Sequence, residues 1–302
     1  MTLDVILRDG GRVTLEHLNA GGAESHDVHA LSRACTDADG AEPFNEATQL
    51  NLADRIPIRA SFEGQTVGLA LIRDASGAAE VEIAVHPDHR RRGIGAALLH
   101  ATKEREASPV TAWAHGNTEG AKALAKRHGL VATRTILKLA RPAAPTDARA
   151  LDDAAPAGIE IRAFEPGRDD AEIARVNAAA FSWHPEQGQM DADAFAARIR
   201  QDWFRPEHLL VAADTATGAV LGFNWLKITH DEAEIYVLGV DPAAGGRGIG
   251  RALTDRGLAL IASLGFDQTV LYVEADNEKA LGLYGSLGFI ERFRDVLYTV
   301  KA

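Results

Sequence analysis

Two segments of this chain combine glycines and arginines in a pattern that suits the binding of an anionic group. Residues 85–95 read VHPDHRRRGIG and residues 240–250 read VDPAAGGRGIG, a constant spacing of 155 positions (240 − 85 = 155). In each segment an apolar strand leads into a glycine turn that opens a helix. The glycines remove side chains where a ligand approaches the backbone, and the free amides and dipole of a helix start favour negative charge. The pattern predicts two phosphate-binding turns.

The constant spacing also indicates an internal repeat, in which each copy forms one domain. A chain of 302 residues is long enough for two domains of ordinary size. We expect domains at residues 1–141 and 159–302. Residues 142–158 contain three prolines and no hydrophobic periodicity, and are predicted to be a linker. An irregular loop packed across the first domain would have a similar composition.

The elements expected around these turns follow the order of a mixed-sheet α/β domain. In the second half we expect strands at 159–164, 208–213, 220–227, 233–240, 269–274 and 289–300, and helices at 169–181, 191–203, 248–264 and 277–287. The first half repeats this order at 80–85, 93–107, 110–115, 117–128 and 131–139. The predicted fold class is α/β, with two tandem domains that each contain a mixed, mostly antiparallel sheet flanked by helices.

The composition restricts the classes of function. A net charge of −11 argues against a general nucleic-acid surface, although a local arginine cluster can still bind an anion. The single cysteine excludes an intrachain disulfide framework, and the 11 histidines show no spacing typical of a metal site. No secretory signal or apolar run of ~20 residues is visible. We expect a cytoplasmic protein, monomeric or weakly homo-oligomeric, that acts on a small molecule and binds no metal, membrane or nucleic acid.

A second motif follows the later turn, where residues 277–289 read NEKALGLYGSLGF. Together with Arg-x-x-Gly-x-Gly after a strand, it resembles the GNAT superfamily of acetyl-CoA-dependent N-acetyltransferases. The resemblance covers nearly the whole chain and implies two tandem GNAT folds, with the coenzyme pyrophosphate on the glycine turn and pantetheine between two splayed strands. One departure is that Gly245 stands where the first copy has Arg90.

The GNAT resemblance implies coenzyme-binding residues in both copies. In the first copy these are Ile83, Ala84, Val85, Arg91, Arg92, Gly93, Ile94, Gly95 and Ala96. In the second copy they are Leu238, Gly239, Val240, Gly245, Gly246, Arg247, Gly248, Ile249, Gly250, Arg251, Asn277, Glu278, Lys279, Ala280, Leu281 and Gly282.

Several separate segments are similar to a narrower family, mycothiol synthase, which acetylates the cysteinyl amine of a cysteine–glucosamine–inositol conjugate. They are WAHG at 113–116, HPEQG at 184–188, GFNWLK at 222–227, YVLGVDP at 236–242 and LYVEADN at 271–277. This resemblance implies that the acceptor is contacted by Glu46, Glu186, Lys227, Glu234 and Tyr272. The alternatives are a tandem GNAT enzyme for another small amine, such as an aminoglycoside, and a coenzyme-binding protein without activity.

Acetyl transfer to an amine requires a group that takes the proton of the amine. Strand alternation predicts that Glu234 shares a face with Tyr236, Leu238 and Val240, and the family resemblance makes Glu234 the expected base. A solvated residue at the strand end is the alternative. The matching positions of the first copy carry no acid, since they are Ala79, Val81 and Ile83, with Glu80 and Glu82 on the opposite face.

The reaction also requires a proton donor for the departing thiolate and a group that polarises the thioester carbonyl. Tyr284, seven residues after Asn277, is expected to be the donor, with a core aromatic as the alternative. Seven residues after Asn117 the first copy has Leu124, which cannot donate. GNAT geometry implies that the backbone amide of Leu238 polarises the carbonyl. We therefore expect the C-terminal domain to catalyse, while the N-terminal domain binds coenzyme unproductively, supports the fold or frames the substrate.

Overall fold

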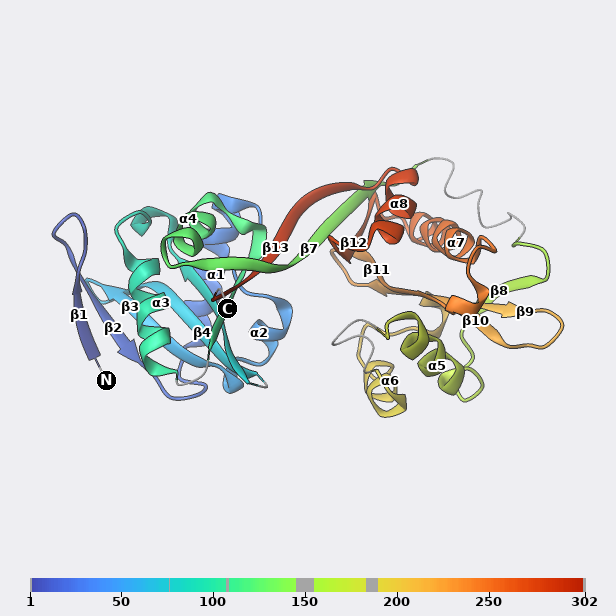
Figure 1. Cartoon of the computed structure of the whole chain (residues 1–302), viewed down its shortest axis with the longest axis horizontal. Coiled ribbons are helices and arrows are strands. Elements are labelled where there is room, and N and C mark those ends of the chain that lie inside the picture. The colour runs from blue at the N-terminus through green and yellow to red at the C-terminus, as the bar shows by residue number, and fades with distance from the viewer. Residues whose placement is uncertain (1, 76, 107–108, 145–154, 183–189, 301–302) are drawn as a thin grey trace. The chain divides into compact units, whose positions relative to one another are not determined.

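The computed structural model describes residues 2–75, 77–106, 109–144, 155–182 and 190–300. The chain forms two compact units, and neither is an uninterrupted stretch (Figure 1). The first unit comprises Met1–Leu137, Glu274–Asp276 and Arg292–Ala302, and the second comprises Lys138–Val273 and Asn277–Glu291. Of the expected linker 142–158, residues 145–154 lie outside the described residues.

The first unit is built on a sheet in which antiparallel hairpins precede one parallel crossover. Its strands are β1 (Thr2–Ile6), β2 (Arg12–His17), β3 (Ile56–Phe62), β4 (Gln65–Ala75), β5 (Ala78–Val85), β6 (Val110–Ala114) and the first part of β7 (Leu130–Pro142). Its helices are α1 (Ser25–Asp39), α2 (Glu46–Leu50), α3 (Ile94–Arg105) and α4 (Glu119–Arg127). Strands β1 to β6 pair in chain order, and β5 with β6 is the parallel pair.

The second unit repeats this plan. Its strands are the end of β7, then β8 (Ile159–Ala163), β9 (Leu209–Asp214), β10 (Val220–Ile228), β11 (Ala233–Val240), β12 (Gln268–Glu274) and the start of β13 (Ile290–Val300). Its helices are α5 (Asp170–Ala180), α6 (Ala192–Arg198), α7 (Ile249–Ser263) and α8 (Glu278–Ser286). The sheet order is β7-β12-β11-β10-β9-β8, and β11 with β12 is the parallel pair. The predicted fold class is confirmed in both units.

One predicted helix is shorter than expected. We expected helix over residues 191–203, but α6 ends at Arg198. The residues beyond it turn so that Trp203 and Phe204 pack their rings on Trp225, at centroid distances of 5.8 and 5.6 Å. Burial of these aromatic rings therefore outweighs continuation of the helix.

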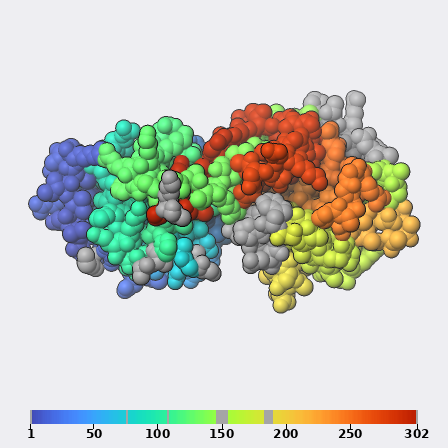
Figure 2. Space-filling model, viewed as in Figure 1, coloured from blue at the N-terminus to red at the C-terminus, as the bar shows by residue number. Residues whose placement is uncertain are grey.

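The two units exchange their last strands. From Arg292 onward β13 belongs to the first unit, where Val296, Leu297 and Tyr298 pair antiparallel with β6. The red residues of this C-terminal strand lie beside green residues of the first unit in the space-filling view (Figure 2). Conversely, β7 leaves the first unit after Leu137, and its remaining residues belong to the second unit, where β7 neighbours β12. The contiguous ranges 1–141 and 159–302 expected from the sequence do not include this exchange.

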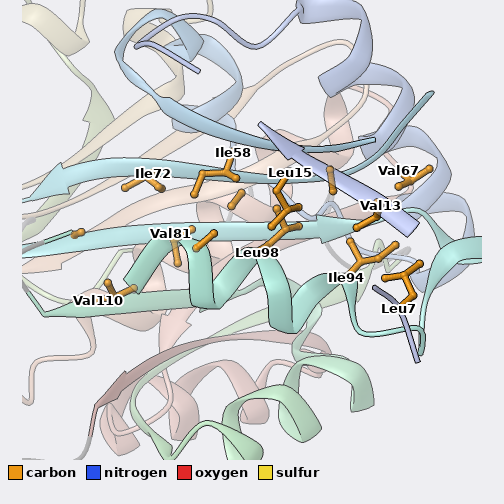
Figure 3. Packing of buried hydrophobic residues seen from close by; sticks show 14 residues of the cluster. Leu7, Val13, Leu15, Ile58, Val67, Ile72, Val81, Ile94, Leu98 and Val110 are labelled. Carbon is orange, nitrogen blue, oxygen red and sulfur yellow. The ribbon is translucent and has the colours of Figure 1, made fainter. Parts of the chain in front are cut away.

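Helices cover both faces of each central sheet, so the middle strands carry apolar side chains on both faces. In the first unit Ile72, Val81 and Leu98 belong to a cluster beneath α3 (Figure 3). The opposite face packs on α1, which places Cys35 against Leu71. In the second unit the α7 face is lined by Leu210, Leu253 and Val240, and the opposite face packs on α5 and α6 with Ile173, Phe195, Phe223 and Trp225 among its residues.

Candidate active site

The glycine turn of the second unit connects β11 to α7. A short 3-10 turn at Pro242–Ala244 follows the strand, and Gly246 and Gly248 then adopt φ values of 79° and 77°. Glycine is the residue that reaches this left-handed region without strain. No side chain caps the start of α7. The amides of its first turn are therefore left for an anionic ligand, as the sequence predicts.

Strand β11 contains a β-bulge before this turn. Trp225 pairs with Val237 and Leu226 pairs with Ile235, so Tyr236 is the extra residue. A bulge of this kind switches the faces on which the side chains before and after it lie. Tyr236 packs with Trp225 on the α5 side, whereas Leu238 packs with the residues beneath α7.

The bulge corrects the expectation that Glu234 shares a face with Leu238 and Val240. Glu234 lies opposite Lys227 in the β10–β11 ladder, and the Lys227 amine lies 5.7 Å from the Trp203 ring on the α5 side. Glu234 and Tyr236 therefore lie on the α5 face, and Leu238 and Val240 on the α7 face. Strict alternation failed here because the bulge adds one residue.

The backbone amide of Leu238 is directed toward the side of β11 that faces β12. The N–H of Asp241 donates to the Leu221 carbonyl at 2.8 Å, which makes Gly222 and Val240 a non-hydrogen-bonded pair. Hydrogen-bonded and non-hydrogen-bonded pairs alternate in an antiparallel ladder, so Asn224 and Leu238, two positions further along, are again a non-hydrogen-bonded pair. The N–H of Leu238 therefore points away from β10. The pairs found between β11 and β12 end at Ile235 with Leu271, five residues before Val240 (240 − 235 = 5). The Leu238 amide thus points toward β12 beyond the last pair found between the two strands.

Tyr284 lies on α8 and is buried, with 7% of its surface exposed. Its ring packs edge-on against Phe289, at a centroid distance of 5.6 Å. Burial raises the pKa of the Tyr284 phenol, so the group keeps its proton at neutral pH. On the same helix Asn277 caps the start, and its side chain accepts a hydrogen bond from the Ala280 amide at 3.1 Å. The predicted residues Glu278, Lys279, Ala280, Leu281 and Gly282 form the first half of this helix.

The glycine turn of the first unit borders a cavity of about 600 Å³. Gly93 adopts a φ of 107° at the start of α3 and Arg91 a φ of 64°. Eight of the nine residues predicted to bind coenzyme in this copy line the cavity: Ile83, Ala84, Val85, Arg91, Gly93, Ile94, Gly95 and Ala96. The first copy therefore brings its predicted coenzyme residues to one concave site.

Arg92, the ninth residue, points elsewhere. Its guanidinium donates to Asp9 at 2.6 Å and lies 4.7 Å from the centre of the Phe62 ring. Arg90 is also engaged, because both of its terminal nitrogens donate to Asp39 at 2.7 Å. In the second copy Arg251 pairs with Asp255 at 2.8 Å, and Arg247 lies 3.8 Å from Asp214. The side chains of Arg247 and Arg251 are about half exposed. They are therefore more accessible to an anionic ligand than Arg90 and Arg92, which are less exposed.

The first copy has no bulge in the equivalent strand. The β4–β5 ladder runs without a shift from Gly68–Val85 to Ala75–Ala78, and Arg73 pairs with Glu80. Gly68 and Gly222 occupy equivalent places, since a Cβ on either would lie 3.2 Å from an isoleucine and a leucine of the following helix. Counted from these glycines, Arg73 and Glu80 match Lys227 and Glu234. The sequence comparison used the spacing of 155 residues between Val85 and Val240. Residues on the other side of the bulge are spaced by 154 positions (222 − 68), so the comparison matched Glu234 to the wrong residue.

The expectation that the first copy lacks a carboxylate at this place is therefore wrong. Glu80 stands at the position of Glu234 and forms an ion pair with Arg73 at 2.8 Å. The two copies differ in strand pairing, because pairing between β5 and β6 continues to Glu82–Trp113, three residues before Val85 (85 − 82 = 3). The open stretch of strand is shorter in the first copy.

As expected, the first copy has no phenol at the position of Tyr284, but the residue that stands there is not the expected Leu124. Thr118, not Asn117, caps α4, and its hydroxyl accepts from the Ala121 amide at 3.3 Å. Matching the two capping residues places Ala125 opposite Tyr284, and Leu124 opposite Leu283. A Cβ on Gly95 would lie 3.8 Å from Leu124 and one on Gly250 would lie 3.9 Å from Leu283, which supports the same alignment.

The residues predicted to bind the acceptor are distributed over both units. Lys227 and Glu234 face each other across β10 and β11, and Tyr272 follows the last residue of β12 found paired with β11. Partial burial and the nearby carboxylates Glu232 and Glu234 raise the pKa of Tyr272. Glu46 begins α2 in the first unit, and Glu186 lies outside the described residues.

Sequence reasoning missed one buried polar cluster, which lies at the cavity of the first unit. His115 contacts Glu82 through Nε2 at 2.7 Å and Asp295 through Nδ1 at 3.1 Å. Burial alone would lower its pKa, but the bonds to Asp295 and Glu82 raise the pKa of His115 to about 9. Asp295 also accepts from the Gly116 amide at 2.9 Å. Only the exchange of β13 brings Asp295 here, so no local pattern could have predicted the cluster.

Comparisons with known proteins agree with this architecture. The profile of the acetyltransferase (GNAT) family matches residues 175–289, and that of an acetyltransferase (GNAT) domain matches residues 55–130. The mycothiol acetyltransferase of Kineococcus radiotolerans is 43% identical over 286 residues, which cover 90% of this chain and 93% of that protein. The mycothiol acetyltransferase of Salinispora tropica is 42% identical, with 93% and 94% covered. The chain belongs to the mycothiol acetyltransferase family. This confirms the resemblance inferred from the sequence.

Two solved structures share the fold of this mycothiol acetyltransferase family member. A GCN5-related N-acetyltransferase from Sphaerobacter thermophilus superposes with a TM-score of 0.72 at 23% identity, covering 96% of both chains. A tandem GNAT protein from the clavulanic acid biosynthesis pathway gives a TM-score of 0.69 at 19% identity, with 95% of this chain and 98% of that chain covered. None of the helices described here is long and apolar enough to span a membrane.

Proposed function

We propose that this protein transfers the acetyl group of acetyl-CoA to the cysteinyl amine of the cysteinyl-glucosaminyl-inositol precursor of mycothiol, and that the reaction takes place in the second unit. The observation that carries this assignment is the bulged strand β11. This strand has no partner residue found on β12 beyond Ile235, so the Leu238 amide points toward an open strand edge, beside an uncapped helix start. The first unit has the glycine turn but not the bulge. The identity to mycothiol acetyltransferases over most of the chain supports the acceptor.

Each required chemical task has a candidate group in the second unit. Glu234 would take the proton of the acceptor amine, directly or through water, and the buried Tyr284 phenol would give a proton to the departing sulfur. The Leu238 amide would polarise the carbonyl of the acetyl group. Acetyl-CoA supplies the activated acetyl group, and the backbone around Gly246 and Gly248 with the start of α7 would hold its pyrophosphate.

Substitution of the two proton-handling residues tests this assignment. We expect Glu234→Gln and Tyr284→Phe each to lower kcat by about 100-fold, because general acid and base groups typically contribute 10²–10⁴-fold. The matched controls are Glu80→Gln, at the equivalent place in the first copy, and Tyr298→Phe, which removes a phenol from the first unit. Near wild-type turnover in Glu234→Gln and Tyr284→Phe, or an equal loss in the controls, would contradict the assignment.

The acceptor is tested by mass spectrometry of the product formed from acetyl-CoA and the cysteinyl-glucosaminyl-inositol compound. We expect N-acetylation there and little with aminoglycosides. Glu186→Ala and Lys227→Met should raise KM for the acceptor more than KM for acetyl-CoA. Acetylation of an aminoglycoside alone would favour the other enzyme class, and no transfer to any amine would favour a coenzyme-binding protein.

We also propose that the first unit binds acetyl-CoA without transferring its acetyl group, and that the protein acts in the cytoplasm as a monomer or weak homo-oligomer. The cavity lined by Val85, Gly93 and Gly95 supports coenzyme binding, and the shorter open strand edge argues against transfer. Calorimetry with acetyl-CoA should give two sites per chain. Sedimentation velocity tests the oligomeric state.

A further inference from the structure

Arg175 connects helix α5 to the segment that leads into the glycine turn of the second unit. Its Nη1 donates to the Asp241 carboxylate at 2.6 Å, and its Nη2 donates to the Val220 carbonyl at 2.8 Å. Asp241 directly follows β11, and Val220 is the first residue of β10. Nη2 also donates to Glu172 on the preceding turn of α5, at 3.0 Å. One guanidinium thus joins α5, the start of β10 and the end of β11.

Asp241 shapes the backbone at the start of the glycine turn. The carboxylate oxygen that does not bind Arg175 accepts from the Ala243 amide at 2.9 Å, and this bond begins the 3-10 turn Pro242–Ala244. The Asp241 side chain is only 15% exposed, so these partners and not water fix its position. A change at Arg175 is therefore passed through Asp241 to the backbone that precedes the left-handed glycines.

Both members of this ion pair are charged at neutral pH. The hydrogen bond from Arg175, and after it the bond from the Ala243 amide, hold the pKa of Asp241 below its usual range. The bonds to Glu172 and Asp241 raise the pKa of Arg175. Arg175 thus neutralises a carboxylate beside the turn, where an unpaired negative charge would repel a bound pyrophosphate.

The first copy makes the corresponding link from different residues. There the turn supplies the cation, because both terminal nitrogens of Arg90 donate to Asp39 at the end of α1. In the second copy Gly245 stands at the position of Arg90, and in the first copy His86 stands at the position of Asp241. Helices α1 and α5 both cover the sheet face opposite the helix that follows the turn. Each copy therefore ties its glycine turn to this helix, with the charges exchanged.

We propose that Arg175 is a positioning residue for acetyl-CoA in the second unit. It fixes and neutralises Asp241, and through Asp241 it holds the backbone around Gly246 and Gly248 in the arrangement that receives the pyrophosphate. This inference rests on the proposed function for the coenzyme and for the unit that uses it. It also explains how the second copy binds coenzyme with Gly245 in the place of an arginine.

The first test compares Arg175→Met with Glu172→Ala, which removes another partner of the same guanidinium but leaves its bond to Asp241. We expect Arg175→Met to raise the KM for acetyl-CoA about fivefold or more, which corresponds to ~1 kcal/mol. The values of kcat and of the acceptor KM should change by less than about twofold. Arg175→Lys should recover part of the loss, and Glu172→Ala should behave as the wild type. An unchanged KM in Arg175→Met, or an equal rise in Glu172→Ala, would contradict the proposal.

A double-mutant cycle tests whether the effect passes through Asp241. Asp241→Asn removes the ion pair but keeps a side-chain oxygen that can accept from the Ala243 amide. In this background Arg175→Met should raise the KM for acetyl-CoA by less than about twofold, because the two residues act as one unit. A full additional rise would show that Arg175 acts by another route and would overturn the proposal.

A shorter donor separates the glycine turn from general stability. S-Acetylpantetheine carries the acetyl thioester but no pyrophosphate, so the wild type and Arg175→Met should use it with equal kcat/KM. An equal loss with S-acetylpantetheine and with acetyl-CoA would mean that Arg175 only supports the fold, and the positioning role would be wrong.

Hydrogen exchange measured by mass spectrometry gives a readout without turnover. CoA should slow exchange in the peptide of residues 241–252 in the wild type, and at the same concentration it should do so less in Arg175→Met. Equal protection in the two proteins, or no protection in the wild type, would overturn the inference. Weaker protection in Arg175→Met, from a protein that acetylates nothing, would support the positioning role and contradict only the proposed function.

Discussion

His115, which directly follows β6, contacts Glu82 of β5 and Asp295 of β13, and its protonated ring is the form that both carboxylates stabilise. Its pKa is raised to about 9 in the folded protein, above the usual value of 6.5. A group whose folded pKa is raised stabilises the protein fully below the unfolded pKa and loses this contribution as the pH rises through the folded pKa. The relevant window here is therefore about pH 6.5 to 9.

We predict that the free energy of unfolding of the wild type falls by about 2 kcal/mol more than that of His115→Gln between pH 7 and pH 10. Urea titrations at a series of pH values measure this difference. Other groups that titrate in this range are present in both proteins and cancel in the comparison. Parallel pH profiles for the two proteins would show that His115 is not held as a cation.

For single residues, the sequence predicted where the glycine turns lie, but it predicted the positions of the proton-handling side chains only in part. Gly93 and Gly248 are identified by a local motif, because a strand-to-helix turn requires a left-handed residue there. The face of Glu234 was predicted wrongly, since alternation assumes that no residue is inserted. The signal was present: the spacing is 154 from Gly68 to Gly222 but 155 from Val85 to Val240, which indicates one extra residue in the second copy.

Among the elements, α7 is held against the second sheet by a polar contact that the first unit lacks. Asn224 of β10 is fully buried, and its amide donates to the Leu253 carbonyl at 2.9 Å. Gly257 lies directly over this side chain, so that a Cβ on it would collide with the Asn224 amide and approach Leu226 at 3.2 Å. The equivalent residue of β4 is Ala70, which cannot form this contact, and Leu98 of α3 packs in the same cluster as Ala70.

We predict that Gly257→Ala lowers the stability of the second unit by about 2 kcal/mol, because overpacking in a core typically costs ~1–3 kcal/mol. Gly285→Ala is the matched control, since it lies in α8 with open space around it and should stabilise by about 0.5–1 kcal/mol. Thermal unfolding measures both. The double variant Asn224→Ala with Gly257→Ala should recover part of the loss, and a Gly257→Ala protein as stable as the control would contradict the packing argument.

Most elements of the second half were predictable because their apolar patterns and glycine boundaries are local. The length of α6 was not, since it depends on Trp203 and Phe204 packing against Trp225 of a strand that follows later in the sequence. In the sequence, the residues at the end of β7 look like an ordinary continuation of the same strand. Nothing in its residues indicates that Lys138 changes units, because the partner strand β12 decides this.

For the whole molecule, the strand exchange makes each unit depend on residues of the other copy. The first unit takes Val296, Leu297 and Tyr298 as partners of β6, and the Tyr298 hydroxyl donates to Asn117 at 2.9 Å. Removing this strand would expose the backbone groups and apolar side chains of β6. Neither half of the repeat is therefore a complete folding unit.

We predict that deletion of residues 292–302 destabilises the first unit far more than the second. Hydrogen exchange measured by mass spectrometry should show loss of protection in β6, while β9 of the second unit stays protected. Addition of a peptide with the sequence of residues 290–300 should restore protection in β6. Unchanged protection of β6 in the truncated protein would rule out a structural role for the exchanged strand.

The exchange also has a consequence for biosynthesis. A ribosome completes the whole of the first copy long before it adds the segment that closes the sheet of that copy. The nascent N-terminal half must therefore wait with one edge of β6 unpaired until β13 has been synthesised, so a segment made late completes the half that was made first.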